Sequence, residues 1–321
     1  MTDLSEQLEL IRMSFIYFVP ETILIAGIIV LLIAGLIKKD GSSLFTFLAS
    51  STFLLSFIIH IINWTIYSSP QNIFHGMLRS DGFSAYLKLL IDLAGLFTVI
   101  MTWRQKKQPH LSEFYALIIT VGLGAHLLVM SVNLVMVFIS LELVSIPSYA
   151  ITGFSFSKQG AEGSQKYFLF GSTASAVMLY GFTLMYGLTG TFDFSSPGFV
   201  DALIGNQSTL VLLAGAMALA GFFYKMAAAP MHPWAPDVYE AAPMPVVAFF
   251  SVVPKLAGLA VLTRFSLALN LFGQATFDWQ FVICFVAMLT LTVGNFSALW
   301  QRRPKRLMAY SSIAQSGFLL V

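Results

Sequence analysis

Several charged residues lie inside long apolar stretches, where ionisable side chains are rare. Glu142 falls eight residues into one stretch, and Lys255 follows Pro254 in the middle of another, with no other polar residue between Ser251 and Thr263. A charge near the centre of a bilayer costs at least about 2.5 to 3.5 kcal/mol on insertion scales, so such residues usually face each other or water. Burial disfavours a charged lysine and a nearby carboxylate favours it. These residue types therefore favour proton transfer; the alternative for Glu142 is a structural carboxylate that accepts hydrogen bonds from Ser or Tyr.

A proline-rich segment directly follows a third charge, Lys225. The prolines at positions 230, 233 and 236 lack an N–H donor and restrict the residue before each of them, so the helix should break between Met226 and His232. Broken helices at membrane depth line cavities and form ion sites in transporters. Lys225 therefore belongs either to such a cavity or to an interfacial loop, with its side chain extended to the headgroups.

Other ionisable residues are weaker candidates. Lys166 lies near the start of its apolar run and is either a relay lysine or an interface anchor. His232, beside the proline-rich segment, is the one histidine that we count as a candidate relay member. Lys88 and Arg264 are interpreted as helix-end anchors or as side chains that extend to the headgroups. His60 and His126 are interpreted as core or interface histidines.

The composition identifies an integral membrane protein. The 321 residues are 57% hydrophobic and only 10% charged, whereas charged residues make up about a quarter of a soluble domain. A net charge of +2 offers no nucleic-acid surface, and the single cysteine, Cys284, excludes disulfide frameworks and iron–sulfur ligation. No GxGxxG, Walker, HExxH or CxxC pattern occurs, which argues against nucleotide, zinc or flavin chemistry. We expect no cofactor and no metal in this chain.

The apolar runs predict an all-α bundle of ten membrane helices, since about 20 apolar residues span the hydrocarbon core. The first run is too long for a signal-peptide core and follows acidic residues, so it should remain as an anchor. The tenth begins near Lys305 and is still apolar at Val321, so we expect the chain to be a fragment of a longer protein. The other nine runs are 15–37, 44–67, 83–103, 114–130, 134–154, 165–188, 209–229, 246–269 and 277–300.

The loops between these runs are asymmetric in charge. One set contains only Arg12 and Arg79, and the alternate set contains ten basic residues. Lys and Arg concentrate in cytoplasmic loops, so the N-terminus should lie outside. The ten are Lys38, Lys39, Arg104, Lys106, Lys107, Lys158, Arg302, Arg303, Lys305 and Arg306.

Three motifs carry a resemblance to a known family. They are 221–225 (GFFYK) with 230–243 (PMHPWAPDVYEAAP), 305–317 (KRLMAYSSIAQSG), and 165–171 (QKYFLFG) with 186–191 (YGLTGT). The first two resemble the signatures of the antiporter-like membrane subunits of respiratory complex I, and the third is most similar to the subunit N group. The resemblance covers essentially the whole chain and is strongest from about Asn133 onward. Ala241, Met244, Gln315 and Phe318 depart from the usual residues.

The resemblance implies a fold of leading helices followed by two inverted five-helix repeats, each with a broken helix and a proton half-channel. Residues 1–112 would form three leading helices, 113–270 the first repeat and 271–321 the start of the second repeat, cut short before its relay lysine. Carried over by position, Glu142, Lys166, Lys225 and Lys255 would form the proton relay.

The implied function is proton translocation within an NADH:quinone oxidoreductase of the bacterial inner membrane. Other membrane subunits would be the partners, and NADH, FMN, iron–sulfur clusters and quinone would belong to partner subunits. Two alternatives stay open: a subunit of a multisubunit cation/proton antiporter, and a membrane scaffold whose buried charges only fix helix packing.

Overall fold

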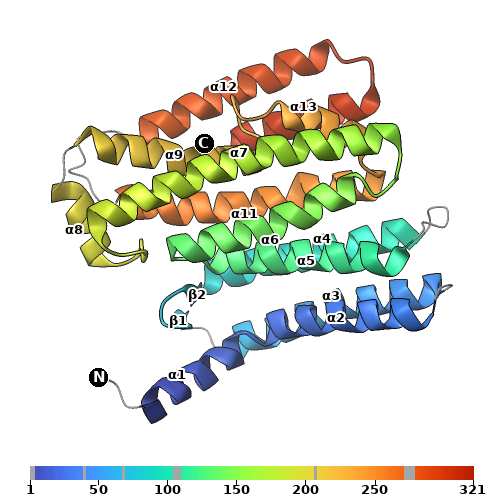
Figure 1. The fold of residues 1–321 in the computed structure, drawn as a ribbon, viewed down its shortest axis with the longest axis horizontal. Coiled ribbons are helices and arrows are strands. Elements are labelled where there is room, and N and C mark those ends of the chain that lie inside the picture. Colours follow the sequence, from blue (N-terminus) through green and yellow to red (C-terminus); the bar gives the residue numbers. More distant parts are fainter. Residues whose placement is uncertain (1–3, 39–40, 67–68, 104–109, 206–207, 271–278) are drawn as a thin grey trace.

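A computed structural model describes residues 4–38, 41–66, 69–103, 110–205, 208–270 and 279–321. These residues form a helical bundle whose long helices run along the longest axis of the molecule (Figure 1). Nine helices of the described residues are long and apolar enough to cross a membrane. These are α2 (Val19–Ile37), α3 (Ser42–Ile66), α4 (Gly82–Trp103), α5 (Leu111–Met130), α6 (Leu134–Thr152), α7 (Lys158–Thr189), α9 (Thr209–Met226), α11 (Met244–Asn270) and α12 (Trp279–Leu299).

Each of the nine corresponds to a predicted run, and the tenth run forms α13 (Pro304–Leu319). The expected all-α membrane bundle is therefore confirmed. Three shorter helices complete the described helical part: α1 (Leu4–Tyr17), α8 (Pro197–Gly205) and α10 (Trp234–Ala241).

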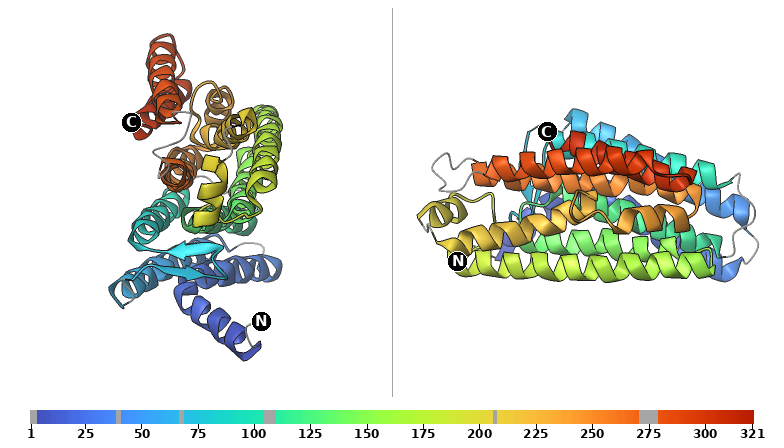
Figure 2. Two further views of the ribbon diagram at one scale, coloured as in Figure 1. Left: turned by 90° about the vertical axis from the view of Figure 1, so that its left-hand side faces the viewer. Right: turned by 90° about the horizontal axis from the view of Figure 1, so that it is seen from above.

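The beginning of the first run differs from the prediction. Residues 15–37 were expected to form one helix, but α1 ends at Tyr17 and α2 begins at Val19, with Pro20 in its first turn. Proline lacks an N–H donor and has a fixed φ angle, which suits the first turn of a helix and not its interior. The chain consequently bends at this point, and α1 projects from the bundle (Figure 2).

Helix α7 begins seven residues earlier than the sequence predicted. Ser157 caps its N-terminus by accepting a 3.0 Å hydrogen bond from the Gly160 N–H, and Gly190 ends it in the left-handed conformation with φ 71°. At a rise of about 1.5 Å per residue, these 32 residues extend over roughly 48 Å, which exceeds the hydrocarbon core of about 30 Å. Part of α7 therefore lies beyond the hydrocarbon region.

The two ends of the bundle are chemically different. A two-stranded antiparallel hairpin, β1 (Gln71–Ile73) with β2 (Leu78–Ser80), covers one end, which we call the hairpin end. Isolated bridges tie this hairpin to Ser131 and tie Asn133 to Asp193. The start of α7, helix α10 and the start of α13 lie at the opposite end, which we call the basic end (Figure 1). Lys39, Arg104, Lys106 and Lys107 of the predicted basic loops lie outside the described residues.

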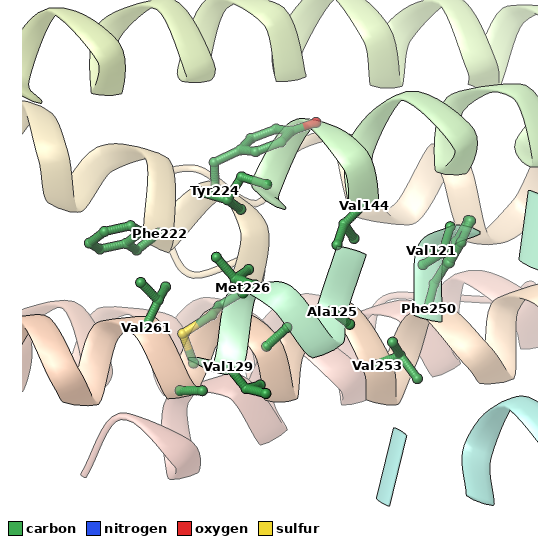
Figure 3. Close-up of a cluster of buried hydrophobic side chains, with 14 of the residues drawn as sticks. Val121, Ala125, Val129, Val144, Phe222, Tyr224, Met226, Phe250, Val253 and Val261 are labelled. Carbon is green, nitrogen blue, oxygen red and sulfur yellow. The ribbon is translucent and has the colours of Figure 1, made fainter. Parts of the chain in front are cut away.

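The core is centred on α5, which is buried along most of its length. Helices α2, α3 and α4 pack on one part of its surface, and α6 and α11 pack on another. Figure 3 shows buried side chains where α5, α6 and α11 meet, among them Ala125 of α5, Val144 of α6 and Val253 of α11. Met226 of α9 lies in the same cluster. The buried lysines of α9 and α11 come from the same helices as this core.

Candidate proton-transfer site

The helix break occurs where the prolines predicted it. Helix α9 ends at Met226, Ala227 has φ 56°, and α10 begins at Trp234. Two freed backbone groups find side-chain partners on the last two helices. The Ala229 N–H donates to Thr290 Oγ1 of α12 at 2.9 Å, and Met226 O accepts from Ser316 Oγ of α13 at 2.6 Å. The break is thus held by specific hydrogen bonds within the bundle.

Lys225 is the last charged residue before this break and is 2% exposed. Its Nζ donates a 3.0 Å hydrogen bond to Ser145 Oγ of α6. Ser145 also donates to Leu141 O at 2.6 Å. The buried position excludes the interfacial-loop interpretation, in which the ammonium group would reach the headgroups.

Glu142 lies one helical turn before Ser145 on α6. It is half-buried. No ion pair within 4 Å joins the two side chains in the described part of the chain, and Glu142 Oε1 has no hydrogen-bond partner there. A serine hydroxyl rather than a carboxylate therefore contacts the lysine, and the approach of Glu142 to Lys225 stays a prediction.

Lys255 is 3% exposed and follows Pro254 within α11. Its Nζ donates to the backbone oxygen of Ser312 and, at 2.6 Å, to Ser312 Oγ, both on α13. Ser312 Oγ in turn lies 2.9 Å from the Tyr239 hydroxyl of α10. The ammonium group of Lys255 thus has only neutral oxygen partners among the described residues.

The side chain of Lys225 packs on α11 one helical turn from Lys255. A Cβ added at Gly258 would lie 3.7 Å from both Cβ and Cγ of Lys225, so the aliphatic part of Lys225 packs over this glycine. Gly258 follows Lys255 by three residues and is therefore its neighbour on the helix surface. The arrangement gives a series of polar groups from Glu142 through Ser145, Lys225 and Lys255 to Ser312 and Tyr239.

Lys166 lies apart from this series. It is 42% exposed and pairs with Glu162 at 2.8 Å and with Asp237 at 3.0 Å, at the basic end of α7. Arg306 pairs with Asp237 and, at 2.6 Å, with Glu240, and Arg303 also pairs with Glu240. These side chains line a cavity of about 190 Å³. Lys166 therefore lies among partly exposed charged groups at the basic end, and its predicted relay role stays a prediction.

Glu240, like Asp237, pairs with two basic side chains. Burial by itself would raise the pKa of its carboxyl group, but the hydrogen bonds from Arg303 and Arg306 outweigh this and hold the pKa below its usual value. Helix α10 is therefore joined to the start of α13 by charged groups that persist at neutral pH.

His232 lies within the broken segment and is half-buried. Its Nδ1 is buried and has no hydrogen-bond partner in the described residues. Among those residues, the structure shows no hydrogen bond between His232 and either buried lysine, so the arrangement leaves this histidine beside the series and not within it.

A further buried group was missed by the sequence interpretation. Lys88, predicted as a helix-end anchor, is 2% exposed and forms a 2.8 Å ion pair with Glu21, and His126 contacts Glu21 and Asp92. The anchor prediction for Lys88 is wrong because the carboxylate partner comes from α2, which is distant in sequence. Two signals were available: Asp92 follows Lys88 by four residues, and Glu21 lies within an apolar run. Arg264 does match its helix-end prediction, since it pairs with Asp81 at 2.7 Å at the hairpin end.

The sequence and the fold can be compared with those of known proteins. Residues 131–321 match the family described as the transmembrane region of NADH:quinone oxidoreductases and Mrp antiporters. The chain is 38% identical over 310 residues to NAD(P)H-quinone oxidoreductase subunit 2 of Picosynechococcus, covering 94% of this chain and 58% of the relative. It is 35% identical over 322 residues to NADH-quinone oxidoreductase subunit N of Chlorobium chlorochromatii, covering 97% and 63%. The chain thus spans about three fifths of the length of these relatives.

Solved structures show the same relationship. A chain of respiratory complex I from Thermus thermophilus superposes with a TM-score of 0.79 at 31% identity, over 93% of this chain and 62% of that one. A chain of an archaeal membrane-bound sulfane sulfur reductase gives a TM-score of 0.83 at 25% identity, over 95% and 63%. The fold is also that of a chain of the Mrp complex from Dietzia, with a TM-score of 0.80 at 18% identity, over 95% and 58%. The chain therefore belongs to the transmembrane family shared by NADH:quinone oxidoreductases and Mrp antiporters.

Proposed function

We propose that the chain is a proton-translocating membrane subunit of an NADH:quinone oxidoreductase. The similarity to quinone oxidoreductase subunits along nearly the whole chain supports this assignment. The chain would work in a bacterial inner membrane beside other membrane subunits. NADH, FMN, the iron–sulfur clusters and quinone would be bound by partner subunits, so this chain would contribute proton transfer and no redox step.

One observation carries the proposal: two deeply buried lysines have neutral hydrogen-bond partners. Lys225 donates to a serine hydroxyl, and Lys255 donates to a serine hydroxyl and a backbone oxygen. A buried ammonium group without an adjacent carboxylate is energetically unfavourable, whereas a hydroxyl can accept from the charged amine or donate to the neutral one. Such lysines are suited to changing protonation state, while a lysine in a tight ion pair would stay charged.

Proton transfer would be controlled by the charge on Glu142. A carboxylate attracts an ammonium group, so a change in the charge of Glu142 would alter how tightly Lys225 holds its proton. The released proton would pass to Lys255. The side chain of Lys225 contacts α11 at Gly258, three residues after Lys255. Ser312 and Tyr239 would continue the route toward α13 and the basic end. Lys166 and His232, both predicted from the sequence, would have positions outside this route.

The two alternatives predict different behaviour. A subunit of a cation/proton antiporter would copurify with antiporter chains and not with subunits that bind iron–sulfur clusters. A scaffold would need its buried charges for assembly only. The identities of 35% and 38% to quinone oxidoreductase subunits support the first assignment.

Replacement of Lys225 or Lys255 by methionine tests the proposal, because methionine keeps an apolar volume and removes the titrating group. The variants belong in membrane vesicles that contain the subunit within its complex, assayed for quinone reduction and acidification together. Acidification should fall at least tenfold, while the complex still assembles. Lys158→Met, at the exposed start of α7, is the matched control and should pump normally. Wild-type acidification and turnover in both buried-lysine variants would refute the relay and leave the scaffold alternative.

A further inference from the structure

Helices α2 to α5 contain a second group of buried charges, at the hairpin end. Lys88 Nζ lies 2.8 Å from Glu21 Oε1, and Ser56 Oγ donates to Asp92 Oδ2 at 2.9 Å. Glu21, Asp92 and His126 are fully buried, and Lys88 is nearly so. These residues come from α2, α3, α4 and α5, and none belongs to the series of groups around Lys225 and Lys255. We call Glu21, Lys88, Asp92 and His126 the leading-helix cluster.

His126 connects the two carboxylates of this cluster. Its Nδ1 forms a 3.1 Å hydrogen bond with Glu21 Oε1, and its Nε2 lies 3.2 Å from Asp92 Oδ1, an ion-pair distance without the alignment of a hydrogen bond. An ionised carboxylate only accepts hydrogen bonds, and a neutral imidazole has one nitrogen that only accepts. A neutral ring would therefore place a lone pair against an anionic oxygen at one of the two contacts. The two short distances to carboxylate oxygens favour a ring with both nitrogens protonated.

The charges of the cluster balance in that state. Lys88 and a doubly protonated His126 carry two positive charges, which match the two carboxylates of Glu21 and Asp92. Charge balance matters here because an uncompensated charge in a buried site is strongly destabilising. The proton on His126 is therefore held by the net charge of its surroundings as well as by its two direct contacts.

His60 of α3 links the cluster to a small cavity. Its ring centre lies 6.0 Å from that of His126, and its buried Nδ1 has no hydrogen-bond partner in the described residues. The cavity has a volume of about 20 Å³, enough for about one water molecule. Both His60 and Lys88 line it, and Asn63, Ser80 and Asp81 line its side toward the hairpin end. Asp81 is paired with Arg264 of the adjacent α11, so that arginine does not reach the cluster as a free charge.

We propose that the leading-helix cluster is a proton-binding site, in which His126 holds the proton between Glu21 and Asp92 and His60 exchanges it with the cavity at the hairpin end. The proton leaves from Nδ1 or Nε2 of the His126 imidazolium and passes to His60. A proton returns to His126 by the reverse route. A water bridging the two rings would span the 6.0 Å between their centres. The site is independent of the proposed relay, because it shares no residue with it.

The protonation state can be measured on the full chain in lipid bilayers by ¹⁵N NMR of labelled histidine, which distinguishes imidazolium from both neutral tautomers. At pH 7.5, the wild type should show a doubly protonated ring that disappears in His126→Gln. Glu21→Gln should convert this ring to a neutral tautomer, because Lys88 alone then balances Asp92. Glu21→Gln combined with Lys88→Met should restore the imidazolium, because His126 alone then balances Asp92. A neutral His126 in the wild type, or no recovery in the double variant, would overturn the proposal.

Exchange through His60 distinguishes a proton-binding site from a permanent structural ion pair. After a jump from pH 7.5 to pH 10.5, the His126 imidazolium signal should decay in the wild type. It should decay at least tenfold more slowly in His60→Phe, which keeps an aromatic ring and removes the exchanging nitrogens. His110→Phe, at the exposed start of α5, should decay like the wild type. An imidazolium that never decays, or equal decay with and without His60, would show a structural role only. None of these measurements requires quinone reduction or pumping, so they remain valid if the proposed function fails.

Discussion

At the scale of single residues, the electrostatic environment of each buried lysine depends on its ion-pair or hydrogen-bond partner. Lys88 has a carboxylate at 2.8 Å, so its charge is compensated and fixed. Lys225 and Lys255 have serine oxygens, and their charges depend on groups farther away. The same residue type therefore occurs in two different electrostatic environments at similar burial. The sequence alone did not reveal this difference, because the partners come from other helices.

Lys255→Arg should impair proton pumping even though the positive charge is retained. A guanidinium group remains protonated in proteins and cannot release its proton to a neighbour. Acidification by vesicles that contain the variant complex should fall at least tenfold relative to the wild type, with the complex still assembled. Lys158→Arg at the exposed start of α7 is the control and should pump normally. Full pumping by Lys255→Arg would show that a fixed charge suffices at this position.

At the scale of the helices, close packing depends on a few small residues. A Cβ at Gly181 of α7 would lie 2.8 Å from Ala218 N and 2.9 Å from Ala214 O, both backbone atoms of α9. Backbone atoms cannot rotate away as a side chain can, so the two helices would have to separate. Gly187, six residues later on α7, is exposed and has no atom within 4 Å of the same position. The pair therefore offers a comparison within one helix.

Gly181→Ala should lower the stability of the purified chain in detergent by about 1 to 3 kcal/mol, the usual range for overpacking a filled interface. Gly187→Ala should leave stability unchanged or raise it slightly, because alanine is the better helix former. Thermal unfolding followed by circular dichroism measures both. Equal midpoints for the two variants would mean that α7 and α9 are not packed as closely as the structure has them.

The sequence predicts helices well and predicts their partners poorly. Ten apolar runs and the break after Met226 follow from local composition and proline chemistry, and each has a counterpart in the structure. The separation of α1 from α2 was missed, since the apolar character continues across Pro20. The contact of Glu21 with His126 joins residues 105 positions apart, and no local pattern specifies such a pairing. For the same reason, the sequence could nominate Lys225 and Lys255 but could not identify Ser145 and Ser312 as their partners.

At the scale of the whole molecule, the two ends of the bundle should face opposite sides of the membrane. The basic end carries Lys158, Arg303 and Arg306, and the hairpin end carries α8 and the strands. Lys and Arg concentrate on the cytoplasmic side, so we propose that the basic end is cytoplasmic and that the N-terminus lies outside. The proposed leading-helix cluster would then exchange protons with the outer aqueous phase, whereas the proposed route through Ser312 and Tyr239 would lead toward the cytoplasm.

Single cysteines at the two ends test this orientation. The native Cys284 is exposed and should first be replaced by serine. Lys158→Cys then reports on the basic end, and Gly198→Cys reports on the hairpin end, where a Cβ would meet no atom within 4 Å. A membrane-impermeant maleimide should label Gly198→Cys in right-side-out vesicles and Lys158→Cys only in inverted vesicles; detergent should expose both. The reverse pattern would place the hairpin end in the cytoplasm, and the leading-helix cluster would then have to exchange its proton with the cytoplasmic side.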